Sequence, residues 1–297
     1  RGHVTGRAVY VNDIDAGSQL LHGFVFYSRW AHGRIISFDL SAAKASPGVK
    51  AVLCAADIPG INQMGPVVHD EVCLASDQVD FFGQAMFLIA ADTEENARAA
   101  VDQIAVEVEE LDAVLDLETA MAQDNRLSPQ RCIETGYPEK IFRQQLNLIE
   151  GELKTGAQEH WYLETQSCLC VPGENNEMKV FSSTQHPSET QAIVAGVLGL
   201  PANRITVEMR RMGGAFGGKE TQANHVAAWT ALLAHATGKP VKIHLFRDDD
   251  QIMTGKRHRF LSKKRADFDD TGKIRTLEAE RNADDGAAID LSYAIME

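Results

Sequence analysis

Four glycines lie within residues 213–218 and make this segment the best suited in the sequence to hold a ligand. Glycine lets the backbone turn sharply and brings its N–H groups close to a bound group. A predicted strand at 205–209 precedes the segment, and a predicted helix at 219–236 follows it. Because the first N–H groups of a helix favour negative charge, the arrangement predicts an anion-binding loop.

The spacing of the glycines leaves three interpretations to compare. A dinucleotide fingerprint, G-x-G-x-x-G, fails from Gly213 because Ala215 stands where its second glycine is needed. A phosphate-binding loop, G-x₄-G-K-[ST], matches as far as Lys219, but Glu220 replaces the hydroxyl that would hold Mg²⁺. A carboxylate there would repel a triphosphate. A tight strand-to-helix turn without any ligand stays open as the third interpretation.

Several segments resemble motifs of the xanthine dehydrogenase/xanthine oxidase family. The run RRMGGAFGGKET at 210–221 resembles the pterin-loop motif of that family. Two segments upstream resemble further family signatures, and three near the N-terminus resemble its first domain. The two upstream segments are 156–166 and 181–187, and the three N-terminal segments are 6–14, 31–35 and 46–49. The motifs follow one another in the family's order, from about Gly6 to the end of the sequence.

The resemblance implies an α/β (α+β) protein with an N-terminal α/β hammerhead domain followed by the first part of a molybdopterin-binding domain. We expect the hammerhead domain at 1–122, a linker at 123–136 and the molybdopterin-binding part at 137–297. The residues themselves agree with an α/β layer. Short apolar runs such as 85–91 alternate with turn signals, and a helical pattern follows Asp92.

The resemblance also implies a function. Members of this family hydroxylate an electron-poor carbon at a molybdopterin (Mo) centre, with water as the oxygen source. Electrons then leave through iron–sulfur clusters and FAD, which we expect on other domains or subunits. We expect hypoxanthine and xanthine as substrates. Two alternatives remain: a molybdenum hydroxylase acting on aldehydes or other N-heterocycles, and a non-catalytic fragment that acts only in assembly.

The family motifs assign roles to six residues of this sequence. Gln185 matches the glutamine that donates to the molybdenum oxo group, and Phe216 matches a loop residue beside the metal. Gly214, Ala215 and Gly217 complete the cofactor loop, and Glu220 matches the carboxylate that contacts a purine. Each type also has an ordinary structural use. A glutamine can end a strand, a phenylalanine can anchor a core, and a glutamate can begin a helix.

Two departures from the family pattern matter. Ala215 stands where the family usually has a third glycine, and a positive φ there would cost about 1–2 kcal/mol. The arginine that binds substrate and the glutamate that acts as base belong to a region beyond Glu297. We considered His160 and Glu164 as substitutes, but no catalytic base is identifiable, so we expect the chain alone to be inactive.

Composition limits the remaining classes of function. The 29 basic and 42 acidic side chains give a net charge of −13, which argues against nucleic acid or anionic membrane as a partner. No apolar run approaches the roughly 18 residues of a membrane span. The chain opens at Arg1 with no signal-peptide pattern, and we expect a cytoplasmic piece of a longer gene product. We expect an oligomer containing the rest of the molybdenum subunit, with iron–sulfur and flavin partners.

Smaller patterns complete the prediction. Five cysteines without a C-x-x-C pair are typical of reduced, buried thiols, and Cys168 and Cys170 are predicted in a core strand at 161–171. The acidic run 248–250 is predicted as a solvated turn. The basic residues of 256–265 are expected to face acidic neighbours or a partner subunit.

Overall fold

The computed structural model describes residues 1–144 and 147–296. It divides into two compact units, each assembled from two stretches of chain. Unit 1 comprises Arg1–Ala113 with His160–Gly255, and unit 2 comprises Val114–Glu159 with Lys256–Glu297. The predicted α/β (α+β) class is confirmed, because helices and sheets build the chain together. Within the described residues, no helix has both the length and the apolar character needed to cross a membrane.

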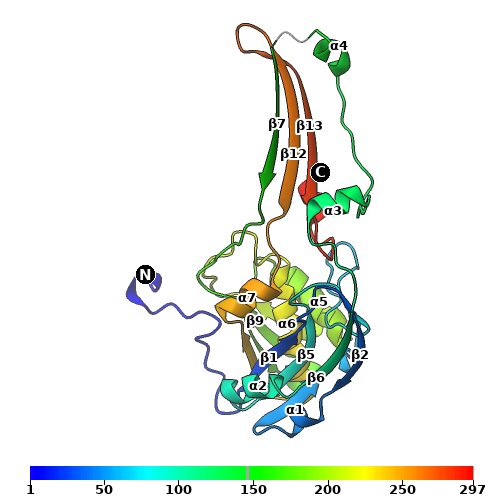
Figure 1. Ribbon diagram of the computed structural model, residues 1–297. Helices are drawn as coiled ribbons and strands as arrows, with labels where there is room; N and C mark the ends of the chain where they lie inside the picture. The colour runs from blue at the N-terminus through cyan, green and yellow to red at the C-terminus, as the bar shows by residue number, and fades with distance from the viewer. Residues whose placement is uncertain (145–146, 297) are drawn as a thin grey trace. The chain divides into compact units, whose positions relative to one another are not determined.

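Unit 1 is built on a mixed seven-stranded sheet with the order β10-β9-β8-β11-β1-β5-β3. Figure 1 labels β1, β5 and β9 of this sheet. β1 pairs in parallel with β11, so the two stretches of unit 1 share one sheet. β9 and β10 are also parallel, and the other neighbours are antiparallel. The strands are β1 (Leu21–Tyr27), β3 (Val49–Leu53), β5 (Ala85–Ala91), β8 (Ser167–Pro172), β9 (Met178–Ser182), β10 (Ile205–Glu208) and β11 (Val241–His244).

Two helices, α5 (Pro187–Leu198) and α6 (Gln222–Thr237), pack against each other and build the main core of unit 1. α6 is buried without interruption from Val226 to Ala234, and its many alanines allow close approach to β8. Both helices end at a glycine in the left-handed region, Gly199 and Gly238. This packing sets the end of β9 and the start of α6 on the same core.

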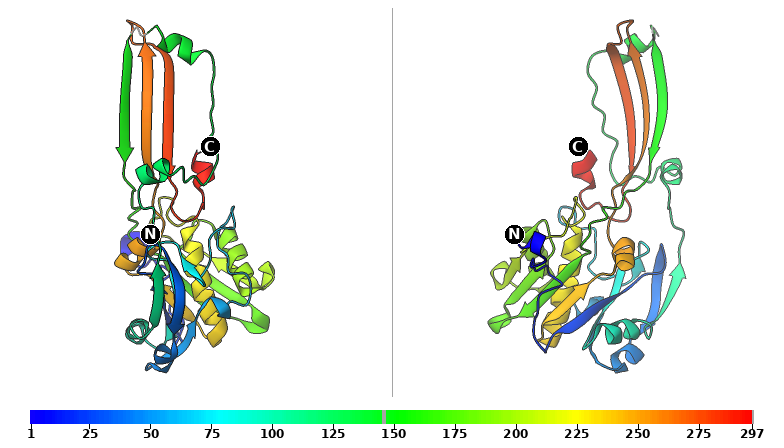
Figure 2. Two further views of the ribbon diagram at one scale, coloured as in Figure 1. Left: turned by 45° about the vertical axis from the view of Figure 1, so that its right-hand side comes forward. Right: turned by 90° about the vertical axis from the view of Figure 1, so that its left-hand side faces the viewer.

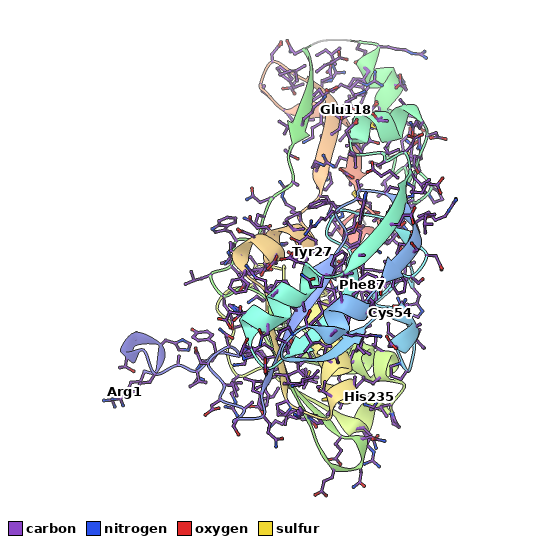
Figure 3. All side chains as sticks on the ribbon, turned by 60° about the horizontal axis from the view of Figure 1, so that its bottom comes forward. Arg1, Tyr27, Cys54, Phe87, Glu118 and His235 are labelled. Carbon is purple, nitrogen blue, oxygen red and sulfur yellow. The ribbon has the colours of Figure 1, made fainter. Side chains whose placement is uncertain are left out.

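A second core of unit 1 lies around β5, whose residues are all buried. Phe87, labelled in Figure 3, contacts Phe26 and Phe38 with ring centroids 5.5 and 4.9 Å apart. The predicted helix after Asp92 is confirmed as α2, where the Thr93 hydroxyl accepts the first N–H bond. The remaining elements are a small β4-β2-β6 sheet with β2 (Gly33–Asp39), β4 (Gln78–Val79) and β6 (Ala105–Glu110), and α1 (Ser41–Ala45), α2 (Glu94–Val101), α7 (Arg247–Met253), and 3₁₀ turns at His3–Thr5, Ala55–Asp57, Glu174–Asn176 and Ala202–Arg204.

Unit 2 is an antiparallel three-stranded sheet, β13-β12-β7, whose strands lie side by side in both views of Figure 2. Most basic residues of β12 face acidic neighbours, one of the two expected alternatives, whereas Lys264 lies opposite Gly151 and Ala279. Lys263 lies opposite Glu152 and Glu280, and Arg265 forms ion pairs with Glu139 and Glu278. The elements are β7 (Leu148–Thr155), β12 (Arg259–Phe268), β13 (Ile274–Asp284), α3 (Leu117–Ala122), α4 (Pro138–Phe142) and α8 (Ser292–Met296).

Three local predictions are wrong. The strand predicted at 161–171 begins only at Ser167, because Trp161 has a φ of 52° and the chain before β8 is irregular. The acidic run 248–250 lies in α7 instead of a solvated turn, and Asp250 is 1% exposed. The thiols are not all buried: those in β8 are, but Cys132 is exposed.

Residues 61–75 form a strap that is tied to α6 at two points. The Glu71 carboxylate lies 2.8 Å from His225 Nε2, and the Trp229 indole donates to the Cys73 carbonyl at 3.0 Å. Burial alone would raise the pKa of Glu71, but the charge and hydrogen bond of His225 together bring it below its usual range. The strap is therefore stabilised by an ionised glutamate.

We expect Glu71→Gln to reduce stability in a pH-dependent way. A carboxyl whose folded pKa is lowered stabilises the native state above its ordinary value of 4.5, and that contribution disappears as the pH falls through the lowered pKa. The free energy of unfolding should fall by about 1.5–3 kcal/mol above pH 4.5, and the difference should vanish in acid. Denaturant titrations over pH measure it, with exposed Glu110→Gln as control. A difference independent of pH would contradict the ionised pair.

Candidate functional site

The glycine loop, residues 213–219, connects the end of β10 to the start of α6 in unit 1. Three of its residues have positive φ: Gly214 at 99°, Phe216 at 56° and Gly217 at 94°. Ala215 does not, and its side chain is buried. The methyl group that replaces the third glycine therefore carries no left-handed strain, and the conditional cost of 1–2 kcal/mol does not arise.

The loop lies directly on the irregular segment 160–164. A Cβ at Gly213 would come within 2.5 Å of the Glu164 Cβ, and one at Gly218 within 2.6 Å of the His160 ring and 2.8 Å of the Tyr162 ring. Real Cβ atoms do not approach so closely, so these two glycines are required by contact with a neighbour. The two segments that carry family-like motifs thus pack against each other.

Gln185 follows the end of β9 and lies against the loop. Its side-chain oxygen, Oε1, accepts hydrogen bonds from the backbone N–H groups of Gly217 at 3.1 Å and Lys219 at 3.2 Å. The orientation of the amide follows, since only the oxygen can accept from these donors. The Nε2 hydrogens have no protein acceptor within the described ranges, and the residue is exposed. Gln185 therefore presents two neutral donors to the outside.

The outer surface of the loop offers further donors. Within residues 1–144 and 147–296, the backbone N–H groups of Gly214, Ala215 and Phe216 have no protein acceptor. Successive unpaired N–H groups on a loop form a concave surface that attracts negatively charged or oxygen-rich groups. The Phe216 side chain is 77% exposed, so it is not an anchor of the core. Its positive φ instead directs an aromatic ring away from the protein interior.

Glu220 lies between the loop and the first turn of α6. Its backbone N–H donates to the Gly217 carbonyl at 3.2 Å. The residue is half-buried, and its carboxylate has no protein partner in the part of the chain that the structure describes. Five of the six residues singled out by the sequence thus lie at 214–217 and 220. The sixth, Gln185, is hydrogen-bonded to the loop. Their roles toward a cofactor and substrate stay predictions.

Sequence reasoning missed a buried ion cluster beneath the loop. Lys219, which drew attention only through the failed phosphate-loop match, is fully buried and pairs with Glu164 at 3.2 Å. Burial lowers the pKa of Lys219, and the Glu164 carboxylate counteracts part of that shift. The ammonium group also donates to Ser183 Oγ at 2.8 Å. The only sequence signal was the occurrence of Lys219, Glu164 and Ser183 within three separate family-like motifs.

The same cluster decides against Glu164 as a substitute base. Its Oε2 accepts from the Gly213 N–H at 2.7 Å, from Ser183 Oγ at 2.7 Å and from Lys219. The side chain is only 12% exposed. His160, the other candidate, stacks on Tyr162 below the loop, with ring centroids 6.4 Å apart. His160 and Glu164 are therefore not aligned on one face of a strand. The Glu164 carboxylate is also not open to a substrate.

A second buried network supports the segment from below. The Tyr162 hydroxyl donates to Asp250 of α7 at 2.7 Å, and the other Asp250 oxygen accepts from the Gln166 N–H at 2.7 Å. The Gln166 amide donates to the Gly218 carbonyl at 2.9 Å. Burial and the Asp250 charge both raise the pKa of Tyr162, so it remains a neutral donor. Asp250, which the sequence predicted in a solvated turn, thus supports the loop from below through Gln166.

The outer surface therefore suits a cofactor that brings oxygen atoms. Neutral amide and backbone donors stabilise negative oxygen without changing their own protonation. No group of three or more His, Cys, Asp or Glu side chains arranged to hold a metal ion occurs within the described residues. The groups that could contact a cofactor here are Gln185 Nε2 and the backbone N–H groups of 214–216, whereas the Gly217 N–H is bonded to Gln185.

Comparison with known proteins agrees with this fold. Residues 121–297 match the family of the molybdopterin cofactor-binding domain, and residues 5–112 match the aldehyde oxidase and xanthine dehydrogenase a/b hammerhead domain. A hammerhead followed by a molybdopterin-binding region defines the class of protein. The chain belongs to the aldehyde oxidase and xanthine dehydrogenase family, as the sequence motifs predicted, and molybdopterin as the cofactor of its second region is confirmed.

Individual relatives are consistent with that assignment. The chain is 42% identical to xanthine dehydrogenase of Oryza sativa subsp. japonica and 41% identical to xanthine dehydrogenase/oxidase of Felis catus. Each match covers 99% of this chain and 22% of the relative, so the chain spans about a fifth of those proteins. Aldehyde oxidoreductase from Desulfovibrio gigas superposes with a TM-score of 0.86 at 25% identity, over 95% of this chain and 33% of that one. Quinoline 2-oxidoreductase from Pseudomonas putida 86 superposes with a TM-score of 0.83 at 26% identity, over 94% of this chain and 38% of that one.

We expect Gly218→Ala to disrupt the loop. The new methyl group would overlap the rings of His160 and Tyr162, and overpacking of this kind costs about 1–3 kcal/mol. Gly196→Ala in α5 is the matched control, because its Cβ meets no atom within 4 Å and alanine favours a helix. Thermal unfolding should show a lower Tm for the first variant and an equal or higher Tm for the second. Equal Tm values for both would mean that the loop does not lie against 160–164.

Proposed function

We propose that this chain is the N-terminal portion of the molybdenum-binding subunit of a xanthine dehydrogenase. The observation that carries the proposal is Gln185, whose Oε1 is held by two loop N–H groups while its Nε2 donors face outward. The roughly 40% identity to xanthine dehydrogenases over almost the whole chain supports it. The complete protein would hydroxylate hypoxanthine and xanthine with oxygen from water.

The residues of this chain would bind and orient the reacting groups. The molybdopterin cofactor supplies the two-electron oxidation and the site at which water is activated. Gln185 Nε2 would donate to an oxygen of the cofactor, and the N–H groups of 214–216 would hold its polar edge. Exposed Phe216 would cover the cofactor and exclude water from one side. Neither step requires a change of protonation in this chain.

Glu220 supports a purine as the substrate. An ionised carboxylate accepts an N–H of a heterocycle, and a protonated one donates, whereas an aldehyde offers neither an N–H nor a ring nitrogen. The Glu220 carboxylate has no partner among the described residues and is free for such a contact. We propose that it distinguishes purines from the substrates of the aldehyde-oxidising relatives.

The rest of the molecule would come from outside this chain. We propose that the remainder of the molybdenum subunit completes the pocket wall, that iron–sulfur and flavin components accept the electrons, and that the assembly is an oligomer in the cytoplasm. We also propose domain limits of 1–122 and 137–297, joined by a linker at 123–136. Because β1 pairs with β11, these two regions share the seven-stranded sheet.

Metal content measures the central claim. The chain is purified with and without a co-expressed remainder of the molybdenum subunit, and molybdenum is measured by plasma mass spectrometry. Molybdenum near one per chain only with the remainder, followed by xanthine turnover, would support the proposal. Turnover of aldehydes or quinolines but not purines would favour another molybdenum hydroxylase. A folded chain without metal in either preparation would favour an assembly fragment.

We expect Gln185→Glu to weaken cofactor binding without unfolding the loop. A glutamate keeps the acceptors for Gly217 and Lys219 but removes both outward donors and adds a negative charge. Loss of a hydrogen bond to a charged group costs about 1.5–3 kcal/mol, so retained molybdenum should fall at least about 10-fold at limiting cofactor. Exposed Gln103→Glu is the control. Equal metal content in both variants would exclude Gln185 from the cofactor site.

Glu220→Gln should act on substrate rather than on cofactor. The neutral amide removes the charge that a purine N–H would meet, and we expect kcat/KM for xanthine to fall about 10- to 100-fold in the assembled enzyme. Molybdenum content should not change. Exposed Glu174→Gln is the matched control. Unchanged kcat/KM for xanthine would show that Glu220 does not contact the purine.

A further inference from the structure

Lys219 makes every hydrogen bond that an ammonium group can make, and all of them lie inside the protein. Nζ donates to the Glu164 carbonyl at 2.7 Å, to Glu164 Oε2 at 3.2 Å and to Ser183 Oγ at 2.8 Å. It also lies 4.6 Å from the centre of the Tyr162 ring. With three hydrogens and three acceptors, the group has none left for a ligand in front of the loop.

The acceptors of Lys219 connect both ends of the glycine loop. Glu164 Oε2, which accepts from Lys219 at the last residue of the loop, also accepts from the N–H of Gly213 at the first. Ser183 donates to the same oxygen. One carboxylate oxygen thus closes the loop from beneath, while the other Glu164 oxygen is buried and has no hydrogen-bond partner among the residues that the structure describes. Such a carboxylate depends on the nearby cation for its stability.

The backbone of Lys219 holds Gln185 on the opposite side. The Lys219 N–H donates to Gln185 Oε1 at 3.2 Å, and its carbonyl accepts from the Gln185 N–H at 2.8 Å. Ser183, in contact with the ammonium, lies two residues before Gln185 on the same stretch of chain. One residue therefore joins the buried ion cluster to the amide that faces outward.

We propose that Lys219 is a positioning residue, whose buried ammonium sets the glycine loop and thereby the direction of the Gln185 amide donors. It does not contact the cofactor or the substrate. The importance of this position for cofactor binding rests on the proposed function, whereas its effect on the loop does not. Without the ammonium group, the buried Glu164 carboxylate would lose its hydrogen-bonded counter-charge and would turn toward water, releasing Gly213 and Ser183.

Amide hydrogen exchange of the full 297-residue chain, followed by NMR without cofactor, tests the loop directly. In Lys219→Met we expect the N–H groups of Gly213, Gly217 and residue 219 to exchange at least about 10-fold faster. Gly213 loses its Glu164 acceptor, and the released loop no longer holds the other two N–H groups against Gln185. The amides of α5 should not change. The control is Lys242→Met, which removes a half-buried lysine whose ammonium donates to two backbone carbonyls outside the loop.

Rescue distinguishes positioning from general damage. The double variant Lys219→Met/Glu164→Gln removes both charges and keeps an acceptor for Gly213, so protection of the three loop amides should return at least partly to the native level. If Lys219→Met does not fold, recovery of folding and of loop protection in the double variant supports the same conclusion. Native exchange at Gly217 in Lys219→Met, or equal acceleration over the whole chain without rescue, would overturn the proposal.

Metal loading provides the second readout. In chain co-expressed with the remainder of the molybdenum subunit, Lys219→Met should retain at least about 10-fold less molybdenum, and the double variant should recover part of it. Faster loop exchange with unchanged molybdenum would leave Lys219 as the residue that orders the loop but contradict the link to cofactor binding. No molybdenum in the native chain would refute the proposed function while the exchange result still decided the role of Lys219.

Discussion

The geometry of this site depends on where the backbone N–H groups of the glycine loop find acceptors. A glycine-rich turn cannot pair most of these groups internally, and buried donors without acceptors are costly. Glu164 takes the N–H at the start of the loop, and Gln185 takes two near its end. The groups at 214–216 are left without protein acceptors in the described chain. These N–H groups are therefore available to a ligand.

The two sides of the loop therefore have opposite chemistry. The inner side contains a buried cation and carboxylate, with the Tyr162–Asp250–Gln166 network below it, and each charge is tied by several short bonds. The outer side offers neutral donors and one exposed aromatic ring, Phe216. Rigid, neutral donors suit a cofactor that brings its own charge, because no proton must move when it binds. The inner charges give the outer side its order.

The fold followed from local patterns wherever one element satisfies its own needs. β5 is a continuous apolar run, and α5 begins at Pro187 and ends before Gly199, so periodicity and end signals located both. For residues 161–166 the same approach predicted a strand that the structure does not contain. Their alternation of apolar and polar side chains is typical of a strand, but contact with the glycine loop holds them in an irregular path. The prediction for Asp250 was wrong for the same reason, since the Tyr162 hydroxyl and the Gln166 N–H that donate to it lie more than 80 residues away.

The sequence by itself determined the family, the loop and the six residues around it, because those depend on residue types in fixed order along the chain. Only the tertiary structure decided how they act. It turned Gln185 so that its amide hydrogens face outward, removed the strain expected at Ala215, and placed Lys219 in the interior, away from any ligand. These outcomes depend on contacts between residues distant in the chain, such as Glu164 with Gly213 and Ser183 with Lys219. The local sequence does not show which donor bonds to which acceptor in the folded chain.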